Sequence, residues 1–306
     1  MGLFALSHPD AASLRALAAY VAEASGSALI LLPLGANSYG AWKAGALPHR
    51  GPGGAQAGPG MNGAQMLASP RKCYLLWGLE PGFDIDNPSR ALAAFAEAET
   101  VIVISPFALR GLRAVADLLI PLAPHPESEG SLENLDGETF GFAAAGRLSG
   151  QSRPGWKILR KAGGELGLDG FSQVDLAGVQ ADMLAAMSGA DLAPSETELT
   201  SADAADGLFR IGDVPMYRVD ALCRRSGPLQ QTVQSESDFV GLNPADAEAL
   251  GLSEGDRARV RQGETQSEFD VIVSERVPVG GVWLRSATCE THMLEHAVGP
   301  LTVEVA

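Results

Sequence analysis

The chain is poor in cysteine and in positive charge, and each shortage argues against a class of protein. Its 306 residues include three cysteines, Cys73, Cys223 and Cys289, which lie far apart and form no Cys-x-x-Cys pair. That argues against a disulfide framework, and against an iron–sulfur cluster held by this chain alone, which usually takes four thiolates. The sequence has 22 Lys and Arg against 37 Asp and Glu, a net charge of −15. This balance argues against a surface that binds nucleic acid.

Long hydrophobic runs are also absent from the sequence. The run ALILLPL at 28–34 is far below the length needed to cross a bilayer. The first residues, MGLFALSHPD, lack the basic region of a secretory signal. We therefore expect no direct membrane insertion, and the few cysteines favour a reducing compartment.

Short apolar runs alternate with helical patterns over the first part of the chain. Asp10 and Ser89 are candidate N-caps of two helices, and Pro154 opens a third, with Trp156, Leu159 and Leu166 as core candidates. Buried parallel strands joined by helical crossovers give an α/β sheet with helices on both faces. The strands are predicted at 28–34, 73–79, 101–105 and 118–123.

The periodicity changes after a polar, acidic and nearly aperiodic segment, which we interpret as a linker at 188–210. Beyond it, a short helix ends at Gly251 and several short strands follow, a pattern that predicts a small β-barrel or sandwich. The predicted domains are therefore an α/β domain at 1–187 and a β-barrel domain at 211–306.

Three polar motifs, GANSYG, GLEPG and HPESEG, follow predicted strands. Ligands of open α/β sheets bind at the carboxyl ends of the strands, so these motifs predict an ancestral binding crevice. Ordinary turns that use Gly and Asn for special backbone angles are the alternative. The crevice residues are predicted to be Gly35, Asn37, Gly40, Gly78, Glu80, Glu127, Gly130 and Asn134.

The stretch HPESEGSLENLDGE, residues 125–138, crowds carboxylates around one histidine. Its spacing matches no EF-hand, and no second His or Cys lies beside His125 to complete a zinc site. We predict no metal site and no catalytic residue there. The favoured interpretation is a structured loop in which Gly130 and Gly137 permit tight turns and Asn134 bonds local backbone.

Two further groups have both a structural and a functional interpretation. Cys289 lies near His292 and His296, a candidate thiol–base pair, but free cysteine is more often a small buried hydrophobe. Arg224 and Arg225 follow Asp220, and either form ion pairs or dock a neighbouring subunit.

Several blocks resemble a known family when they are read in order. The resemblance to molybdopterin oxidoreductases covers the chain from about Leu29 to its end. It rests on GANSYGAWKAGALPHRGPG, LLWGLEPGFD, ADLLIPLAPHPESEGSLENLDGE and NPADAEALGLSEGDRARVR. The stretches RPGWKILR and PMYRVDALCRRSGPLQQT narrow it to the large iron–sulfur subunit of bacterial NADH:quinone oxidoreductase, respiratory complex I.

This resemblance implies a molybdopterin-oxidoreductase-like α/β domain followed by a double-psi barrel. It implies a non-catalytic structural part of a peripheral-arm subunit, in contact with other such subunits on the cytoplasmic side of the inner membrane. Iron–sulfur clusters would lie in an N-terminal region of the family that has no counterpart here, so this chain itself would hold no cofactor. Glu138 stands where many relatives carry Arg, which disfavours molybdopterin. The alternatives are a pterin-dinucleotide-binding oxidoreductase fragment and an independent small-molecule enzyme.

Overall fold

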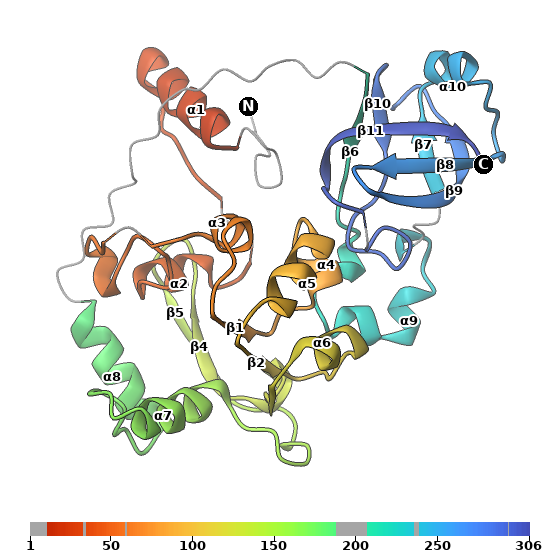
Figure 1. The fold of residues 1–306 in the computed structure, drawn as a ribbon. Helices are drawn as coiled ribbons and strands as arrows, with labels where there is room; N and C mark the ends of the chain where they lie inside the picture. Colours follow the sequence, from red (N-terminus) through yellow and green to blue (C-terminus); the bar gives the residue numbers. More distant parts are fainter. Residues whose placement is uncertain (1–10, 33–34, 59, 188–206, 236–238, 293) are drawn as a thin grey trace. The chain divides into compact units, whose positions relative to one another are not determined.

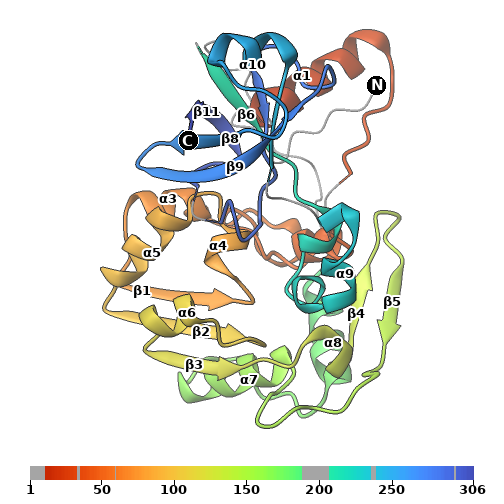
Figure 2. The same cartoon turned by 90° about the vertical axis from the view of Figure 1, so that its right-hand side faces the viewer.

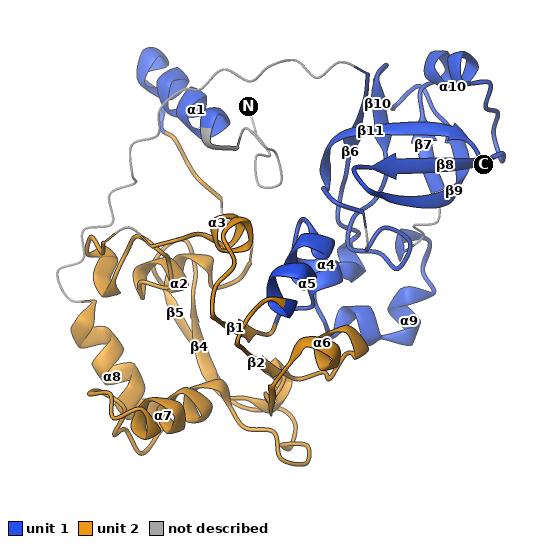
Figure 3. Cartoon of the chain, in the orientation of Figure 1, with its two compact units in different colours: residues 1–28, 79–96, 196–306 blue, residues 29–78, 97–195 orange. Residues whose placement is uncertain are grey.

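The computed structural model describes residues 11–32, 35–58, 60–187, 207–235, 239–292 and 294–306 (Figure 1). The chain divides into two compact units, each built from separate stretches of sequence (Figure 3). Unit 1 comprises residues 1–28, 79–96 and 196–306, and unit 2 comprises residues 29–78 and 97–195. The predicted linker falls mostly on residues 188–206, which lie outside the described residues, and the first barrel strand begins at Leu208.

Unit 2 contains a parallel sheet of three strands in the order β1-β2-β3 (Figure 2). The strands are β1 (Cys73–Trp77), β2 (Thr100–Ser105) and β3 (Leu118–Pro121), close to the predicted ranges. In β1 the buried residues alternate with exposed ones, because Tyr74 and Leu76 face the core and their neighbours do not. The predicted helical cover on both faces stays a prediction.

The predicted first strand at 28–34 is wrong for its described residues, since residues 28–32 have no regular structure. Ile30 and Leu32 are 75% and 71% exposed, so these two side chains are not part of a core. Among the described strands, β1 pairs only with β2. Apolar composition alone does not make a strand, because the backbone also needs a hydrogen-bonded partner.

The later part of the acidic stretch, from Gly130, forms a hairpin with the residues that follow it instead of the predicted loop. Strands β4 (Gly130–Glu133) and β5 (Thr139–Phe142) pair antiparallel around a turn at Gly137, whose φ is 79°. The remaining elements of unit 2 are α2 (Ser38–Lys43), η1 (Pro52–Gly54), α3 (Gly63–Ala68), α6 (Arg110–Val115), η2 (His125–Glu127), α7 (Gly155–Glu165) and α8 (Leu176–Ala186).

Helix α7 begins after Pro154, as predicted, but it buries a different face from the predicted one. Ile158 is 8% exposed, whereas Leu159 and Leu166 are 44% and 74% exposed. The buried position is displaced by one residue, from Leu159 to Ile158, which is about 100° around the helix. Gly155 at the start of the helix packs closely against the Trp77 ring. Helical spacing predicts that a stripe exists, but not which neighbour it will meet.

Unit 1 contains a closed barrel of six strands in the order β10-β6-β11-β8-β9-β7. Its interior is filled by apolar side chains such as Val240, Phe269 and Val282, each fully buried, and this confirms the predicted barrel. The double-psi topology stays a prediction. The strands are β6 (Leu208–Ile211), β7 (Phe239–Leu242), β8 (Arg257–Gln262), β9 (Thr265–Val273), β10 (Gly281–Trp283) and β11 (Val298–Val305).

Helix α10 (Pro244–Leu250) follows β7, with Asn243 as its N-cap and Gly251 at φ 69° as its predicted end. The other elements of unit 1 are α1 (Ala11–Ser25), α4 (Pro81–Asp84), α5 (Pro88–Ala96), η3 (Met216–Arg218), η4 (Cys223–Arg225), α9 (Gly227–Gln230) and η5 (Val233–Ser235). Helix α5 is capped by Asn87, which accepts from the Arg90 N–H, and not by Ser89. No helix of the described residues is long and apolar enough to cross a membrane.

Candidate functional site

Residues 79–96, here the α4–α5 segment, belong to the same compact unit as the barrel. Helix α4 begins at Pro81 and ends at Asp84. The Asp84 carboxylate accepts a hydrogen bond at 2.7 Å from the N–H of Glu80, the residue just before the helix. The segment therefore presents three carboxylates, Glu80, Asp84 and Asp86, within seven residues. Each of them meets a basic side chain from the C-terminal part of unit 1.

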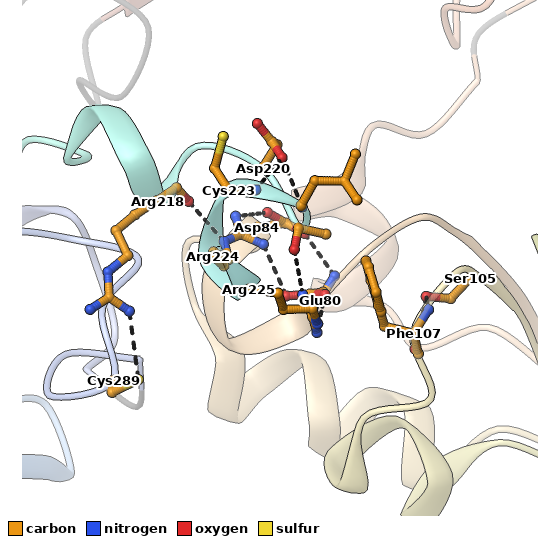
Figure 4. A network of polar contacts seen from close by, with 12 residues as sticks. Glu80, Asp84, Ser105, Phe107, Arg218, Asp220, Cys223, Arg224, Arg225 and Cys289 are labelled. Atoms are coloured by element: carbon orange, nitrogen blue, oxygen red, sulfur yellow. Dashed lines mark hydrogen bonds and ion pairs between the residues drawn. The ribbon is translucent and has the colours of Figure 1, made fainter. Parts of the chain in front are cut away.

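Glu80 and Asp84 form a buried ion-pair cluster with Arg224 and Arg225 (Figure 4). The side chains of Arg224 and Glu80 are only 5% and 1% exposed, and their charged atoms lie 3.1 Å apart. Arg224 also contacts Asp84 at 2.5 Å, lies over the Phe83 ring and donates to the Arg218 carbonyl. Arg225 Nη2 lies 2.7 Å from Glu80 Oε1. The ion-pair interpretation of the two arginines is confirmed.

The pKa values in this cluster follow from its contacts. Burial alone would lower the pKa of Arg224, but hydrogen bonds and charge from Asp84 and Glu80 raise it overall. Burial would raise the pKa of Asp220, but hydrogen bonds from Cys223 and Leu222 and the charge of Arg224 lower it overall. The hydrogen bond to Asp220 raises the pKa of the Cys223 thiol. The raised pKa favours the thiol form of Cys223, and the contacts of Arg224 favour its charged form.

Arg210, on β6, is a buried cation whose five N–H groups all meet neutral acceptors. It is 2% exposed and donates to three carbonyls, those of Leu284, Arg285 and His296, at 2.6–3.2 Å. Its other two bonds go to the Gln262 amide oxygen and the Ser286 hydroxyl. Burial lowers the pKa of Arg210 to about 10, and the nearby charge of Asp86 opposes this. Arginine at that value is still protonated at neutral pH, so a positive charge lies inside unit 1.

Asp86 is held by two consecutive residues of the loop that leads into β11. Its Oδ2 lies 2.6 Å from His296 Nδ1, and its Oδ1 accepts from the Ala297 N–H at 3.0 Å. The side chains of His296 and Asp86 are 43% and 60% exposed, so this pair faces solvent, unlike the Glu80 cluster. The loop itself is fixed from behind, because Arg210 donates to the His296 carbonyl.

These groups line a cavity of about 690 Å³ within unit 1. The volume is that of a small-molecule binding site, and most of the wall is apolar. Ala287 in the wall has φ 56°, and it is the one non-glycine residue of the described part of the chain with positive φ. Such strain is typical of binding sites. The polar lining residues are Asp84, Asp86, Arg210, Ser286, Thr291 and His296.

A buried amide, that of Gln262, lies behind this wall and has one group without a partner in the described part of the chain. Gln262 is 3% exposed, and its Oε1 accepts from Arg210 and from the His296 N–H. Among the described residues its Nε2 has no hydrogen-bond partner, and it lies 3.7 Å from the position that a Cβ would take at Gly299, which lines the cavity. An acceptor atom that enters past Gly299 would satisfy this donor.

The predicted crevice motif GANSYG meets the acidic stretch 125–138 at Glu133, in unit 2. Asn37 Oδ1 accepts from the Glu133 N–H at 2.8 Å, and Lys43 forms an ion pair with the buried Glu133 carboxylate at 2.7 Å. A Cβ at Gly40 would lie 2.3 Å from Asn37 Oδ1, so Gly40 is needed for this close approach. Their polar atoms are thus occupied by one another, and these contacts join α2 to β4.

The other predicted residues have separate local roles. Asn134 bonds the turn backbone as predicted, accepting from the N–H groups of Asp136 and Glu138. Glu127 accepts from the Ser149 N–H. Gly130 lies in β4 and not in the predicted turn, and a Cβ there would lie 2.7 Å from the Phe142 ring. Gly35 and Gly78 have positive φ, and Glu80 lies in the ion-pair cluster of unit 1.

The cavity in unit 1 was not predicted from the sequence, and none of the eight predicted crevice residues is in its described lining. The sequence does hold a signal for Asp86 as a site residue, since Asp86 lies in GFDIDNP, which directly continues the strand-end motif GLEPG. Arg210 fell within the range predicted as linker. The partner of Asp86, His296, lies 210 positions away and has no local signal.

The cysteines are free, but Cys73 and Cys289 are exposed and not buried as expected. His292 Nδ1 faces the Cys289 carbonyl, and the Cys289 sulfur meets Arg218 at 3.7 Å (Figure 4). Because His296 is bound to Asp86, the contacts do not form a thiol–base pair. Among the described residues, no three His, Cys, Asp or Glu side chains are arranged to hold a metal ion.

Part of this chain is similar to a known family of domains. Residues 222–300 match the family model of the molydopterin dinucleotide binding domain. Over 224 residues the chain is 24% identical to the NADPH-Fe(3+) oxidoreductase subunit alpha of Geobacter sulfurreducens. The match covers 68% of this chain and 26% of that relative, so the chain spans about a quarter of its length.

A solved structure shows the same fold. Acetylene hydratase from Pelobacter acetylenicus superposes with a TM-score of 0.53 at 12% sequence identity. The superposition covers 79% of this chain and 46% of that one.

Proposed function

We propose that this chain is the pterin-dinucleotide-binding part of an oxidoreductase, and that the cavity of unit 1 holds the nucleotide portion of the cofactor. The observation that carries the proposal is the cavity itself, which lies largely within the matched residues 222–300 and the α4–α5 segment beside them. The weak resemblance to an oxidoreductase subunit supports the reaction class.

The residues present fit such a group in three respects. The apolar walls, which include Phe83, Phe209 and Leu294, suit a planar heteroaromatic ring. The buried charge of Arg210 favours an anionic group in the cavity. The unpartnered Gln262 Nε2 is a further donor for a phosphate oxygen. The bound cofactor would supply the redox chemistry, while these residues would bind and orient its nucleotide end.

A bulky residue introduced at the cavity wall tests this function. Val214 lines the cavity and is 44% exposed, so Val214→Trp adds volume there without emptying the core. We expect the purified full-length protein to retain less pterin dinucleotide, measured by fluorescence of the extracted pterin and by mass spectrometry of the nucleotide. Val279 is 70% exposed in the same unit and lies outside the cavity lining, so Val279→Trp is the matched control.

The pterin content of the three proteins decides whether the proposal holds. Stoichiometric pterin dinucleotide in the wild type and in Val279→Trp, with loss in Val214→Trp, supports the proposal. A folded wild-type protein that carries no pterin and takes up none would overturn it.

A second proposal is the structural part of the large subunit of an NADH:quinone oxidoreductase. The observation that favours it is the stretch PMYRVDALCRRSGPLQQT, whose two arginines bind the α4–α5 segment. In that case the chain would contact other peripheral-arm subunits on the cytoplasmic side of the membrane and hold no cofactor. Purification of the native assembly decides between the two, because only this proposal predicts a stable complex with quinone-reducing activity and no pterin.

A further inference from the structure

The loop that leads into β11 binds the Asp86 carboxylate through two donors of a kind that also bind anionic ligands. His296 Nδ1 and the Ala297 N–H hold the two oxygens of Asp86 at 2.6 and 3.0 Å. An imidazole beside a backbone N–H is a donor set that also suits a phosphate. Because both donors belong to consecutive residues, they form a small, preformed seat for an anion, here called the anion seat.

The charge behind the anion seat is positive and is not paired by contact. Arg210 supports the seat through the His296 carbonyl, and all of its hydrogen-bond partners are neutral. The carboxylate that acts electrostatically on Arg210 is Asp86, which has no hydrogen bond to it among the described contacts. If Asp86 left, a buried cation would lie beside two free donors, and this arrangement attracts anions.

The Asp86 carboxylate can leave the anion seat at little cost. Its side chain is 60% exposed, so water would replace its contacts if it moved away. Exposed ion pairs of this kind contribute little to stability, in contrast to buried ones. Asp86, Arg210, His296 and Ala297 all line the same cavity, so a ligand in the cavity reaches the seat directly.

We propose that His296, Ala297 and the charge of Arg210 form the phosphate subsite of the cavity, and that Asp86 occupies this subsite as a built-in competitor. The phosphate of a nucleotide ligand replaces the Asp86 carboxylate on the two donors. The nucleotide class rests on the proposed function, whereas the competition rests on the contacts of Asp86. Asp86 thus sets how tightly the phosphate end is held.

The test is calorimetric titration of the full chain with guanosine 5′-diphosphate, and with guanosine as the phosphate-free probe. Asp86→Asn removes the competing charge, while its amide oxygen can still accept from the Ala297 N–H. We expect Asp86→Asn to bind the diphosphate at least about fivefold more tightly, which is the scale of one unit charge a few ångströms away in a solvated site. Guanosine affinity should not change.

Two further variants identify the cause. Asp270→Asn removes the same charge from the outer face of the barrel, where Asp270 pairs with Arg257, and should leave both affinities unchanged. His296→Ala in the Asp86→Asn background removes a donor of the seat, and should return the diphosphate affinity to the wild-type range. Thermal unfolding of each variant confirms that it is folded.

The outcomes distinguish this inference from the proposed function. Equal or weaker diphosphate binding by Asp86→Asn, with guanosine bound by both proteins, would overturn the competition and leave the nucleotide cavity intact. Tighter binding that Asp270→Asn reproduces would also overturn it, because the effect would then be one of net charge. Binding of neither probe by any folded variant would overturn the proposed function, and the inference with it.

Discussion

The Glu80 ion-pair cluster provides the sharpest quantitative prediction, because Glu80 and Arg224 are almost fully buried. Glu80 is 1% exposed and contacts Arg224 at 3.1 Å and Arg225 at 2.7 Å. Glu80→Gln keeps the shape and removes the charge. A hydrogen bond to a charged group is worth ~1.5–3 kcal/mol, and breaking a buried pair costs ~3–5 kcal/mol. Since Arg224 keeps its contact with Asp84, we expect a loss of ~3 kcal/mol.

The assay is equilibrium urea unfolding, with hydrogen exchange to locate the loss within unit 1. Glu268→Gln is the matched control, since Glu268 pairs with Arg259 at 3.1 Å on the barrel surface and its side chain is 46% exposed. An exposed pair of this kind is worth ~0–1 kcal/mol. Exchange should quicken first in residues 79–96, because Glu80 anchors them.

The reasoning is refuted if Glu80→Gln costs no more than Glu268→Gln. It is also refuted if Glu80→Gln and Arg225→Gln are additive, because residues in direct contact should show a coupling of ~0.5–3 kcal/mol. Additivity would mean that the short distance reflects no energetic interaction.

Two further predictions concern pH dependence and close packing. The pKa of Asp220 is lowered in the folded protein, so its contribution is complete above about pH 4 and is lost as the pH falls through the folded-state value. Asp220→Asn should therefore flatten the fall of the urea midpoint in acid, and an unchanged acid limb would contradict this. A Cβ at Gly163 would lie 2.2 Å from the Phe171 ring, so Gly163→Ala should cost ~1–3 kcal/mol in thermal unfolding. Gly164→Ala meets open space on the same helix and should be neutral or stabilising, and similar costs for both would contradict the packing argument.

The sequence predicts the elements whose signal is local. The predictions of strands β1, β2 and β3 were correct because each of these apolar runs also pairs with a neighbouring strand in the structure. Helix α10 was predicted with its end at Gly251, and the structure adds Asn243 as its N-cap. Strand β6 was missed because most of it lies in the range interpreted as a linker, and β7 was not predicted.

The candidate site depends on contacts that have no local signal. Glu80 and Arg224 are 144 positions apart, and Asp86 and His296 are 210 apart. The sequence identified Glu80 as a strand-end carboxylate and Arg224 as an ion-pair candidate, but it could not pair them. Likewise, Arg210 is recognisable only by the five acceptors that surround it in the folded barrel.

The α4–α5 segment joins the barrel through two contacts of opposite character. At its start, Glu80 is buried among arginines, and moving it would leave uncompensated charge inside the protein. Six residues later, Asp86 is 60% exposed and can exchange its partners with water. A segment fixed at one end and exchangeable at the other can stay folded while its free carboxylate leaves the anion seat. The difference in burial between Glu80 and Asp86 is therefore what would allow a ligand phosphate to compete at the cavity without unfolding unit 1.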